Sequence, residues 1–287
     1  MQDIQWYPGH MTKARRMITD QLKYIDVVME IVDARAPYAT RNPDFDDLFS
    51  QKERIILLNK ADLADAEATK RWTEWYRQKG WTALSCSATK RSWWKHLEST
   101  IVKATREIRE KAEKRGIQKT IRIMVAGIPN VGKSTLINSI AKTGSTTVGN
   151  RPGVTKGKQW VKISSYMELL DTPGMLWPKL DDQTSALYLA FLGSIRDGIL
   201  DIEPLSIQLL LKLATICSEG LRQRYKKWTP DLSGEEMLYA VCKSRGFLLS
   251  GGLYDMERAA NTVLDEFRAG KIGMITLEQP DDRILEE

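Results

Sequence analysis

The chain has 287 residues, of which 42% are apolar and 28% are charged, the balance of a folded globular protein rather than of a disordered one. This length allows one large α/β domain and a smaller second domain. No apolar run is long enough to span a membrane, and the first residues lack the basic-then-apolar pattern of an export signal. The three cysteines are scattered and predict neither disulfides nor a zinc cluster. We therefore expect a cytoplasmic protein with no membrane partner.

Charge is distributed unevenly along the chain. Residues 1–177 contain 30 Lys and Arg against 19 Asp and Glu, whereas residues 178–287 contain 13 against 18. The basic front part favours contact with nucleic acid, and a solvated charged surface that also holds a triphosphate is the alternative. The densest basic stretch, residues 103–122, carries three glutamates at helical spacing. It therefore predicts a salt-bridged connecting helix rather than a dedicated RNA arm.

The first part of the chain alternates short apolar runs, which end in polar motif residues, with amphipathic helical stretches. This alternation predicts a mostly parallel sheet with helices on both faces. Strands are expected at residues 26–33, 54–58, 82–85, 121–126 and 167–170. Asp65 can cap a helix that stops near Gly80, and the aromatic residues of that helix fall at i, i+3 and i+4. This spacing predicts a packed face rather than a base-stacking platform.

After Pro178 the pattern becomes helical without strand alternation. Helices are expected at residues 186–195, 206–217, 234–242 and 256–268. The sequence therefore predicts two domains: an α/β domain at residues 1–178, and a small all-α domain at residues 179–287.

The motif Asn59-Lys60-Ala61-Asp62 follows the second expected strand. The Asp62 carboxylate can accept hydrogen bonds from the N1–H and the exocyclic amine of guanine, and adenine does not offer these two donors together. Lys60 can lay its stem along the base, and Asn59 can tie the loop together. After the next strand, the backbone N–H groups of Ser87 and Ala88 can reach the guanine O6. These residues predict a guanine-binding site.

The run Gly127-Ile128-Pro129-Asn130-Val131-Gly132-Lys133-Ser134 lies between a strand and a helix that starts near Thr135, the context that defines a phosphate-binding P-loop. Successive backbone N–H groups of such a loop surround phosphate oxygens at a helix N-terminus. Lys133 is expected to bridge the β- and γ-phosphates, and the Ser134 hydroxyl to bind Mg²⁺. The loop residues expected to bind GTP are Asn130, Val131, Gly132, Lys133, Ser134 and Thr135.

Asp171-Thr172-Pro173-Gly174 follows the last expected strand. Asp171 can hold Mg²⁺ through a water molecule, and the Gly174 N–H can meet the γ-phosphate. Thr155 is the candidate for a second hydroxyl on Mg²⁺, and Thr146 and Thr147 are close competitors for this role.

The order of these motifs is unusual, because the guanine-binding motif precedes the P-loop instead of following it. The sequence therefore predicts a circularly permuted P-loop GTPase domain, followed by the helical domain. Since the Asp171 strand leads directly into the helical domain, loss of the γ-phosphate is expected to re-aim that domain.

Two positions bear on the rate of hydrolysis. Met175 follows Gly174 at the place where Ras-like enzymes carry the glutamine that orients the attacking water. A low basal rate is therefore expected. Asn130 is a candidate ligand for K⁺, and the alternative is that this asparagine only tolerates a tight turn.

With these motifs in view, the chain resembles the ribosome biogenesis GTPase A (YlqF-like) family of circularly permuted GTPases. The resemblance covers essentially the whole chain. The residues that carry it are Trp6-Tyr7-Pro8-Gly9-His10-Met11, Asp33-Ala34-Arg35-Ala36-Pro37, the three nucleotide motifs, Arg151-Pro152-Gly153-Val154-Thr155 and Arg268-Ala269-Gly270-Lys271-Ile272-Gly273.

The resemblance implies a GTP-hydrolysing factor for late assembly of the large ribosomal subunit. Such a factor binds ribosomal RNA and proteins when loaded with GTP, is stimulated by the ribosomal particle, and leaves after hydrolysis to GDP. The family also carries a helical, ANTAR-like RNA-binding domain. In this acidic C-terminal part, RNA contact must be local, for example at Arg222, Arg224, Lys226 and Lys227.

The resemblance further implies that His10 swings into the site in place of the missing glutamine, which makes His10, Lys133 and Gly174 the expected catalytic set. The alternative for His10 is a hydrogen-bonded structural residue in a Pro-Gly turn.

Two other functions remain open. One is a nucleotide-gated RNA chaperone or scaffold with incidental hydrolysis. The other is a small-subunit assembly GTPase, although such enzymes carry an N-terminal OB domain and a zinc knuckle that are not evident in this sequence.

Overall fold

The computed structural model describes residues 10–90, 93–143, 159–178 and 180–283. At its centre is a six-stranded sheet with strand order β3-β2-β1-β4-β6-β5. The strands are β1 (Val27–Asp33), β2 (Glu53–Asn59), β3 (Thr82–Ser85), β4 (Ile121–Ala126), β5 (Gln159–Ser164) and β6 (Met167–Asp171). All neighbouring strands are parallel except β5 and β6. The expected mostly parallel sheet is confirmed, whereas the antiparallel edge strand β5 was not expected.

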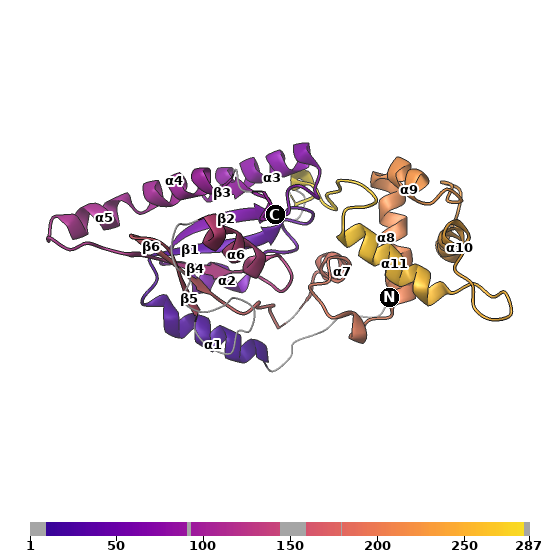
Figure 1. Ribbon diagram of the computed structural model, residues 1–287, viewed down its shortest axis with the longest axis horizontal. Helices are drawn as coiled ribbons and strands as arrows, with labels where there is room; N and C mark the ends of the chain where they lie inside the picture. The colour runs from indigo at the N-terminus through magenta and orange to yellow at the C-terminus, as the bar shows by residue number, and fades with distance from the viewer. Residues whose placement is uncertain (1–9, 91–92, 144–158, 179, 284–287) are drawn as a thin grey trace.

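Helices cover both faces of the sheet, as the sequence predicted (Figure 1). The helices of this part of the chain are α1 (His10–Leu22), α2 (Asp44–Leu48), α3 (Ala66–Gln78), α4 (Trp94–Ala104), α5 (Arg106–Glu113), which projects beyond the strands, and α6 (Lys133–Thr143). Successive residues of a strand face opposite sides. Accordingly, Met29 shares a buried cluster with residues of α4 and α6, whereas Val28 shares one with residues of α1 and α2. Val32 packs with residues of α3.

Helix α3 has the N-terminal cap and the packed aromatic face that its sequence predicted. The Asp65 carboxylate accepts a hydrogen bond from the backbone N–H of Ala68 at 2.7 Å and so caps the helix. Trp72 and Tyr76 are fully buried, and their rings contact Trp75. The aromatic stripe is therefore a packed face, as expected from its spacing.

The rest of the chain is helical. It contains α7 (Gln183–Phe191), α8 (Ile202–Ile216), α9 (Ser218–Arg224), α10 (Gly234–Arg245) and α11 (Met256–Arg268), with short 3₁₀ turns η1 (Asp197–Ile199) and η2 (Pro280–Arg283). These helices enclose a second buried core. Helix α7 belongs to both cores, because Leu189 packs with the sheet and Phe191 with the helices. Throughout the described ranges, every helix is too short or too polar to cross a lipid bilayer.

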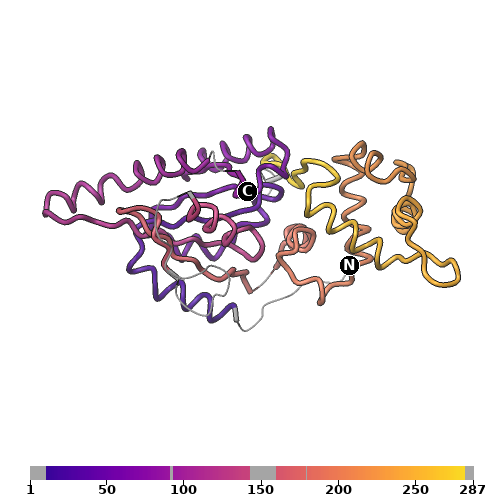
Figure 2. The backbone as a smooth tube through the Cα atoms, in the orientation of Figure 1, coloured from indigo at the N-terminus to yellow at the C-terminus, as the bar shows by residue number. Residues whose placement is uncertain are grey.

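After α11 the chain turns back and runs along α3 (Figures 1 and 2). We call residues 275–278 of this segment the C-terminal strap. The backbone N–H of Leu277 donates to the Arg35 carbonyl at 2.7 Å, and the Trp72 Nε1–H donates to the Glu278 carbonyl at 3.0 Å. The Glu278 carboxylate accepts from the backbone N–H groups of Tyr38 at 2.6 Å and Ala39 at 3.0 Å. The strap thus joins the last helix to the loop after β1.

Glu278→Ala is expected to lower the free energy of unfolding by about 2–4 kcal/mol, because two backbone donors would lose a charged acceptor at a buried position. Urea denaturation would measure the change. Gln279→Ala serves as the control, since the Gln279 side chain accepts an exposed hydrogen bond from Arg71. A Glu278→Ala protein as stable as this control would show that the strap contributes little.

In the helical part, a buried carboxylate joins three helices. Glu266 of α11 accepts hydrogen bonds from Arg224 Nε at 2.9 Å, from the Tyr225 hydroxyl at 2.8 Å and from Arg245 Nη2 at 2.8 Å. Burial opposes ionisation of Glu266, but these donors hold its pKa below the usual range. Arg224 is therefore engaged inside the helical part, which leaves Arg222, Lys226 and Lys227 as the local cations expected to contact RNA.

Glu266→Gln is expected to destabilise the protein by about 3 kcal/mol at pH 7, because two arginines would lose their anion. The lowered pKa means that this stabilisation is present above the ordinary glutamate pKa and is lost as the pH falls through the folded-state value. The difference in unfolding free energy between wild type and variant should therefore shrink in acid. Thermal unfolding over a series of pH values from neutral to acid would test this, and a difference independent of pH would contradict it.

Candidate functional site

The polar motifs meet at one edge of the sheet, where the parallel strands end. Asp33 at the end of β1 is in register with Asn59 at the end of β2. On the other side of β1, strand β4 leads into the P-loop and β6 ends at Asp171. Segments that are far apart in sequence are therefore assembled at the edge where open α/β sheets bind ligands.

The P-loop follows β4 and leads into α6, whose first residue is Lys133. The Lys133 ammonium donates to the carbonyls of Gly127 at 3.2 Å and Ile128 at 2.8 Å, beneath the loop. Burial lowers the pKa of Lys133 to about 8, against the opposing effect of Asp171. A phosphate anion at this position would favour the charged form of the lysine.

Asn59 ties the predicted guanine-binding motif to the P-loop. Its Nδ2 donates to the Val131 carbonyl at 2.8 Å, and its Oδ1 accepts from the backbone N–H of Ala88 at 3.1 Å. Gly132 has a φ of +95°, and a Cβ added there would collide with Asn59 Nδ2. The Asn59 side chain thus holds its own loop, the P-loop and the loop after β3 together, and it leaves room only for glycine at position 132.

Lys60 connects its own loop to the P-loop and to the end of β1. Its ammonium donates to the Asn130 carbonyl at 2.6 Å and lies 2.9 Å from Asp33 Oδ2. Asp33 is also held by Arg35, at 2.8 Å from Nη2 and 2.9 Å from Nε. Burial alone would raise the pKa of Asp33, but the two cations hold it below its usual range. The Asp33 motif was noted in the sequence, but its ion pairs with Lys60 and Arg35 were not predicted. Because Asp33 ends a strand next to the strand that ends at Asn59, its position could have suggested a place near the site.

Asp62 lies at the exposed side of the same loop. Its Oδ2 accepts from the Thr89 hydroxyl at 3.2 Å, and that hydroxyl is 2.8 Å from the Ser87 hydroxyl. The structure therefore brings Asp62 next to the segment expected to meet guanine O6. Its part in base recognition stays a prediction.

Ser134 and Asp171 face each other across the P-loop, with Ser134 Oγ 3.5 Å from Asp171 Oδ2. The Asp171 Oδ1 atom is buried without a hydrogen-bond partner among the described residues, and burial raises the Asp171 pKa against the opposing effect of Lys133. A hydroxyl and a carboxylate with an unpartnered oxygen fit Mg²⁺, which prefers oxygen ligands. Thr155 and its competitors Thr146 and Thr147 lie outside the described residues.

The segment after Asp171 passes very close to the P-loop. A Cβ added at Gly174 would lie 2.7 Å from the Pro129 nitrogen, so only glycine fits this approach. The backbone N–H of Met175 donates to the Gly127 carbonyl at 3.2 Å, and the Met175 side chain is 1% exposed. The side chain after Gly174 is therefore packed inside the protein. His10 begins α1, and its side chain lies outside what the structure describes.

The turn after α7 also touches the P-loop, which the sequence did not predict. The Asn130 side-chain amide donates to the Gly193 carbonyl, and the Ser194 hydroxyl donates to the Pro129 carbonyl at 3.0 Å. Arg268 of α11 holds this turn by donating to the Phe191 carbonyl at 2.9 Å. The helical part is thus in direct contact with the loop expected to carry phosphate.

Arg35 connects the end of β1 to the end of α11. It pairs with Asp33, and its Nη1 donates to the Arg268 carbonyl at 3.0 Å. A cleft of about 400 Å³ lies between the P-loop, the α7 turn and α11. Its charged lining residues are Arg35, Lys60, Arg196, Asp197 and Arg268.

Comparison with known proteins agrees with this geometry. The family described as 50S ribosome-binding GTPase matches residues 122–219, which begin at the strand before the P-loop. Ribosome biogenesis GTPase A of Bacillus cereus is 43% identical over 97% of this chain and 95% of its own length. A GDP-bound structure of TM YlqF superposes with a TM-score of 0.70 at 28% identity, covering 93% of this chain and all of that one. GNP-bound YlqF from Thermotoga maritima superposes with a TM-score of 0.68 at 30% identity, covering 94% and 99%.

Proposed function

Because the chain belongs to the ribosome biogenesis GTPase A family, we propose that this GTPase binds the large ribosomal subunit late in its maturation and leaves after hydrolysis. The observation that carries the proposal is the direct contact between the P-loop and the helical part, at Asn130–Gly193 and Pro129–Ser194. Because of this contact, a change at the γ-phosphate can alter the position of the helices. We place this activity in the cytoplasm, with ribosomal RNA and proteins as the partners.

Each motif has a proposed part in binding GTP. The backbone N–H groups of residues 130–135 surround the phosphates, Lys133 contacts the β- and γ-phosphates, and the Gly174 N–H meets the γ-phosphate. Asp62 reads guanine, with Lys60 along the base and the N–H groups of Ser87 and Ala88 toward O6. The lowered pKa of Lys133 supports its assignment, because a buried ammonium is stabilised by an anionic ligand.

We propose that Mg²⁺ is held by the hydroxyls of Ser134 and Thr155 and, through water, by Asp171. When bound, the ion would supply positive charge to the β- and γ-phosphate oxygens. The Asp171 Oδ1 atom supports this role, since it is buried without another partner among the described residues. Asn130 is proposed to bind K⁺ through its side-chain oxygen, because its amide nitrogen is already bonded to Gly193.

His10 is proposed to act on the attacking water in place of the missing glutamine. A separate group is needed for this step because the Met175 side chain, at the usual glutamine position, is buried. His10 is a candidate for it because it stands at the first residue of α1 rather than inside that helix. The proposal predicts that His10→Ala retains GTP binding but loses stimulated hydrolysis.

GTP turnover with purified large subunits, small subunits or neither tests the function. Without a particle, turnover is expected near the ~10⁻⁴ s⁻¹ of unassisted Ras-like sites, and large subunits are expected to raise it by up to about 10⁵-fold. Parallel assays in K⁺ and Na⁺ buffers would test the K⁺ site. Stimulation by small subunits alone would instead favour the small-subunit function. If His10→Ala lacked hydrolysis but still supported assembly, the scaffold function would be favoured.

A further inference from the structure

A projecting basic arm lies at the end of the sheet opposite the nucleotide site. We define the basic arm as residues 103–119, which comprise the end of α4, all of α5 and the loop leading to β4. Helix α4 buries Leu97 and Ile101, whereas α5 buries no side chain. Figures 1 and 2 show α5 extending beyond the strands. To the described core α5 contributes only the partly buried Ile108, so packing explains little of why this eight-residue helix projects.

The arm is densely basic for its length. Residues 103–119 contain seven Lys and Arg against three Glu, a balance of +4, whereas the whole chain has a balance of +6. Ion pairs within α5 engage Arg106 with Glu110 and Lys111 with Glu107. These pairs stabilise the helix itself. Lys119 pairs with Asp26 at 2.9 Å. Among the described residues no salt bridge engages the remaining cations of the arm, which are Lys103, Arg109, Lys114 and Arg115.

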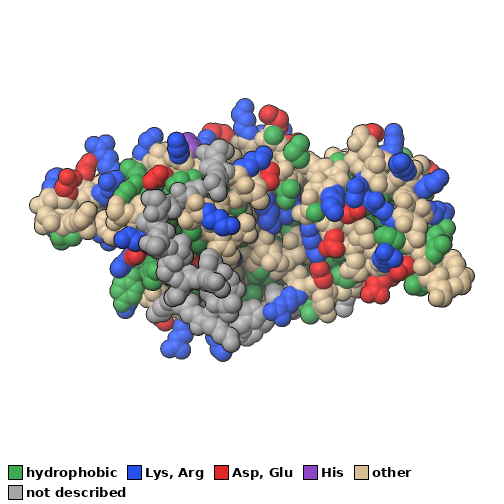
Figure 3. Space-filling model, in the orientation of Figure 1, with side chains coloured by type: hydrophobic (Ala, Val, Ile, Leu, Met, Phe, Trp, Pro, Cys, Tyr) green, Lys and Arg blue, Asp and Glu red, His purple; other side chains and the backbone are tan. Residues whose placement is uncertain are grey.

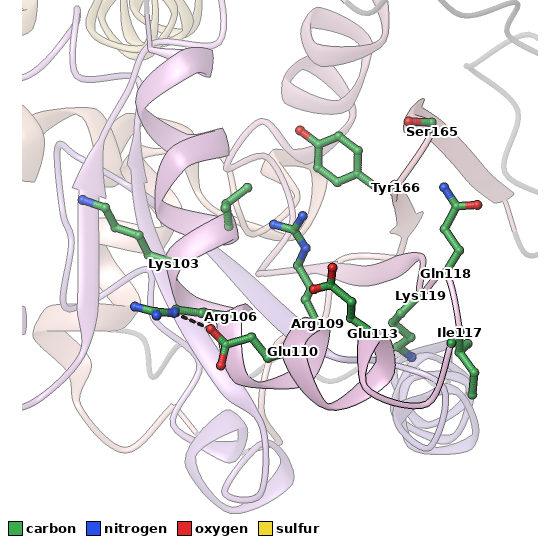
Figure 4. A pocket seen from close by; sticks show the side chains of 12 residues that line it. Lys103, Arg106, Arg109, Glu110, Glu113, Ile117, Gln118, Lys119, Ser165 and Tyr166 are labelled. Carbon is green, nitrogen blue, oxygen red and sulfur yellow. Dashed lines mark hydrogen bonds and ion pairs between the residues drawn. The ribbon is translucent and has the colours of Figure 1, made fainter.

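Beside the arm lies a groove of about 710 Å³, bounded by α5 and the turn between β5 and β6. The Arg109 guanidinium lies over the Tyr166 ring, 5.5 Å from its centre, and the Tyr166 hydroxyl donates to Glu98 at 2.8 Å. Figure 4 shows Arg109 directed toward Tyr166, and Lys103 and Arg106 on the other side of the helix. The arm therefore presents cations on both sides (Figures 3 and 4).

This distribution fits the phosphate backbone of folded RNA. A groove of folded RNA presents phosphates along both of its edges, so they can meet cations on both sides of an inserted element. Folded RNA is recognised largely by shape and by its backbone, which requires flexible cations such as Lys114 and Arg115 at the exposed tip. Because β4 and β6 begin at this end of the sheet and the P-loop lies at the other, an RNA bound here would not compete with GTP.

The glutamate spacing predicted a salt-bridged connecting helix here, but the ion pairs within α5 engage only Arg106 and Lys111. We propose that the basic arm is an RNA-docking surface of the GTPase domain, separate from the helical domain, and that it binds the phosphate backbone of folded RNA. The identity of that RNA as ribosomal rests on the proposed function. With one RNA contact on each domain, a change in the relative position of the two domains would alter how the protein is held on the particle.

The test uses the full chain carrying Lys114→Glu and Arg115→Glu. Binding to protein-free large-subunit RNA is measured over a series of salt concentrations. The affinity is expected to fall by about 10-fold or more, and the slope of log affinity against log salt is expected to decrease by about 1.5, for the loss of two phosphate contacts. Basal GTP turnover and GTP affinity should be unchanged. The conservative exchange Lys114→Arg with Arg115→Lys should retain binding.

Lys70→Glu with Lys79→Glu on and just after α3 is the matched control, because it changes the net charge by the same amount on the same domain. Equal losses in the two double variants would overturn the proposal, since they would reflect net charge alone. Loss of binding to intact subunits with unchanged binding to protein-free RNA would assign the arm to a protein and also overturn it. If wild type is stimulated by subunits but the arm variant binds RNA normally, the arm proposal fails while the proposed function stands. If the wild-type protein binds RNA through the arm but neither subunit stimulates its GTP turnover, the arm proposal stands and the proposed function fails.

Discussion

Lys133→Ala is expected to lower the rate of GTP hydrolysis by about 10²- to 10³-fold, the usual effect of removing one preorganised donor from a developing charge. The Lys133 ammonium lies beneath the P-loop and is held by the carbonyls of Gly127 and Ile128. It is therefore already positioned for a phosphate and needs little rearrangement. Single-turnover hydrolysis with saturating GTP and Mg²⁺ would measure the effect separately from nucleotide binding.

Lys142→Ala is a suitable control, because Lys142 is an exposed lysine in the last turn of the same helix. This control should hydrolyse GTP like wild type. A Lys133→Ala protein with more than about a tenth of the wild-type rate would contradict the assignment, since one lost donor should cost about 10²-fold or more.

Asp62→Asn is expected to weaken GTP binding by roughly 10- to 10²-fold, because the amide oxygen keeps one acceptor but one hydrogen bond to a charged acceptor, about 1.5–3 kcal/mol, is lost. The same change should improve binding of xanthosine triphosphate, whose base offers an acceptor where guanine offers its amine. Among the described residues the Asp62 side chain is hydrogen-bonded to the Thr89 hydroxyl, an exposed contact, so the change should leave folding intact. Competition between the two nucleotides for a fluorescent analogue would measure both effects.

Glu67→Gln removes a carboxylate from the first turn of α3 and controls for the loss of charge near the loop. Unchanged preference for GTP in Asp62→Asn would show that another group reads the base. Reduced binding of both nucleotides together with a lower unfolding temperature would indicate a folding defect instead.

The fold was largely predictable because its strands are buried on both faces. The strand 27–33 is buried at every residue, so its apolar run was visible without any partner. Strand β5 was missed because it is an edge strand paired only with β6, where Lys162 interrupts the apolar residues. Helix α1 was missed although Met11, Ala14 and Ile18 fall on one helical face and are buried.

The contacts between distant surfaces were not predictable. Periodicity shows that α7 has apolar residues, but not that its following turn meets Asn130 of the P-loop. Likewise, the Asp33 motif was visible, but its ion pairs with Lys60 and Arg35 depend on strand register and on where the C-terminal strap returns. The motif residues were placed by local rules, and their roles in binding stay predictions where only a ligand can test them.

The C-terminal strap has a consequence for the order in which the protein folds. The bond from Tyr38 to Glu278 joins residues 240 positions apart, and the bond from Thr276 to Ala34 joins residues 242 positions apart. During synthesis, the loop after β1 emerges early but waits for almost the entire chain before it gains these partners. Such long-range closure slows folding and favours a late cooperative step. A chain that lacks the strap would therefore hold the loop after β1 incompletely.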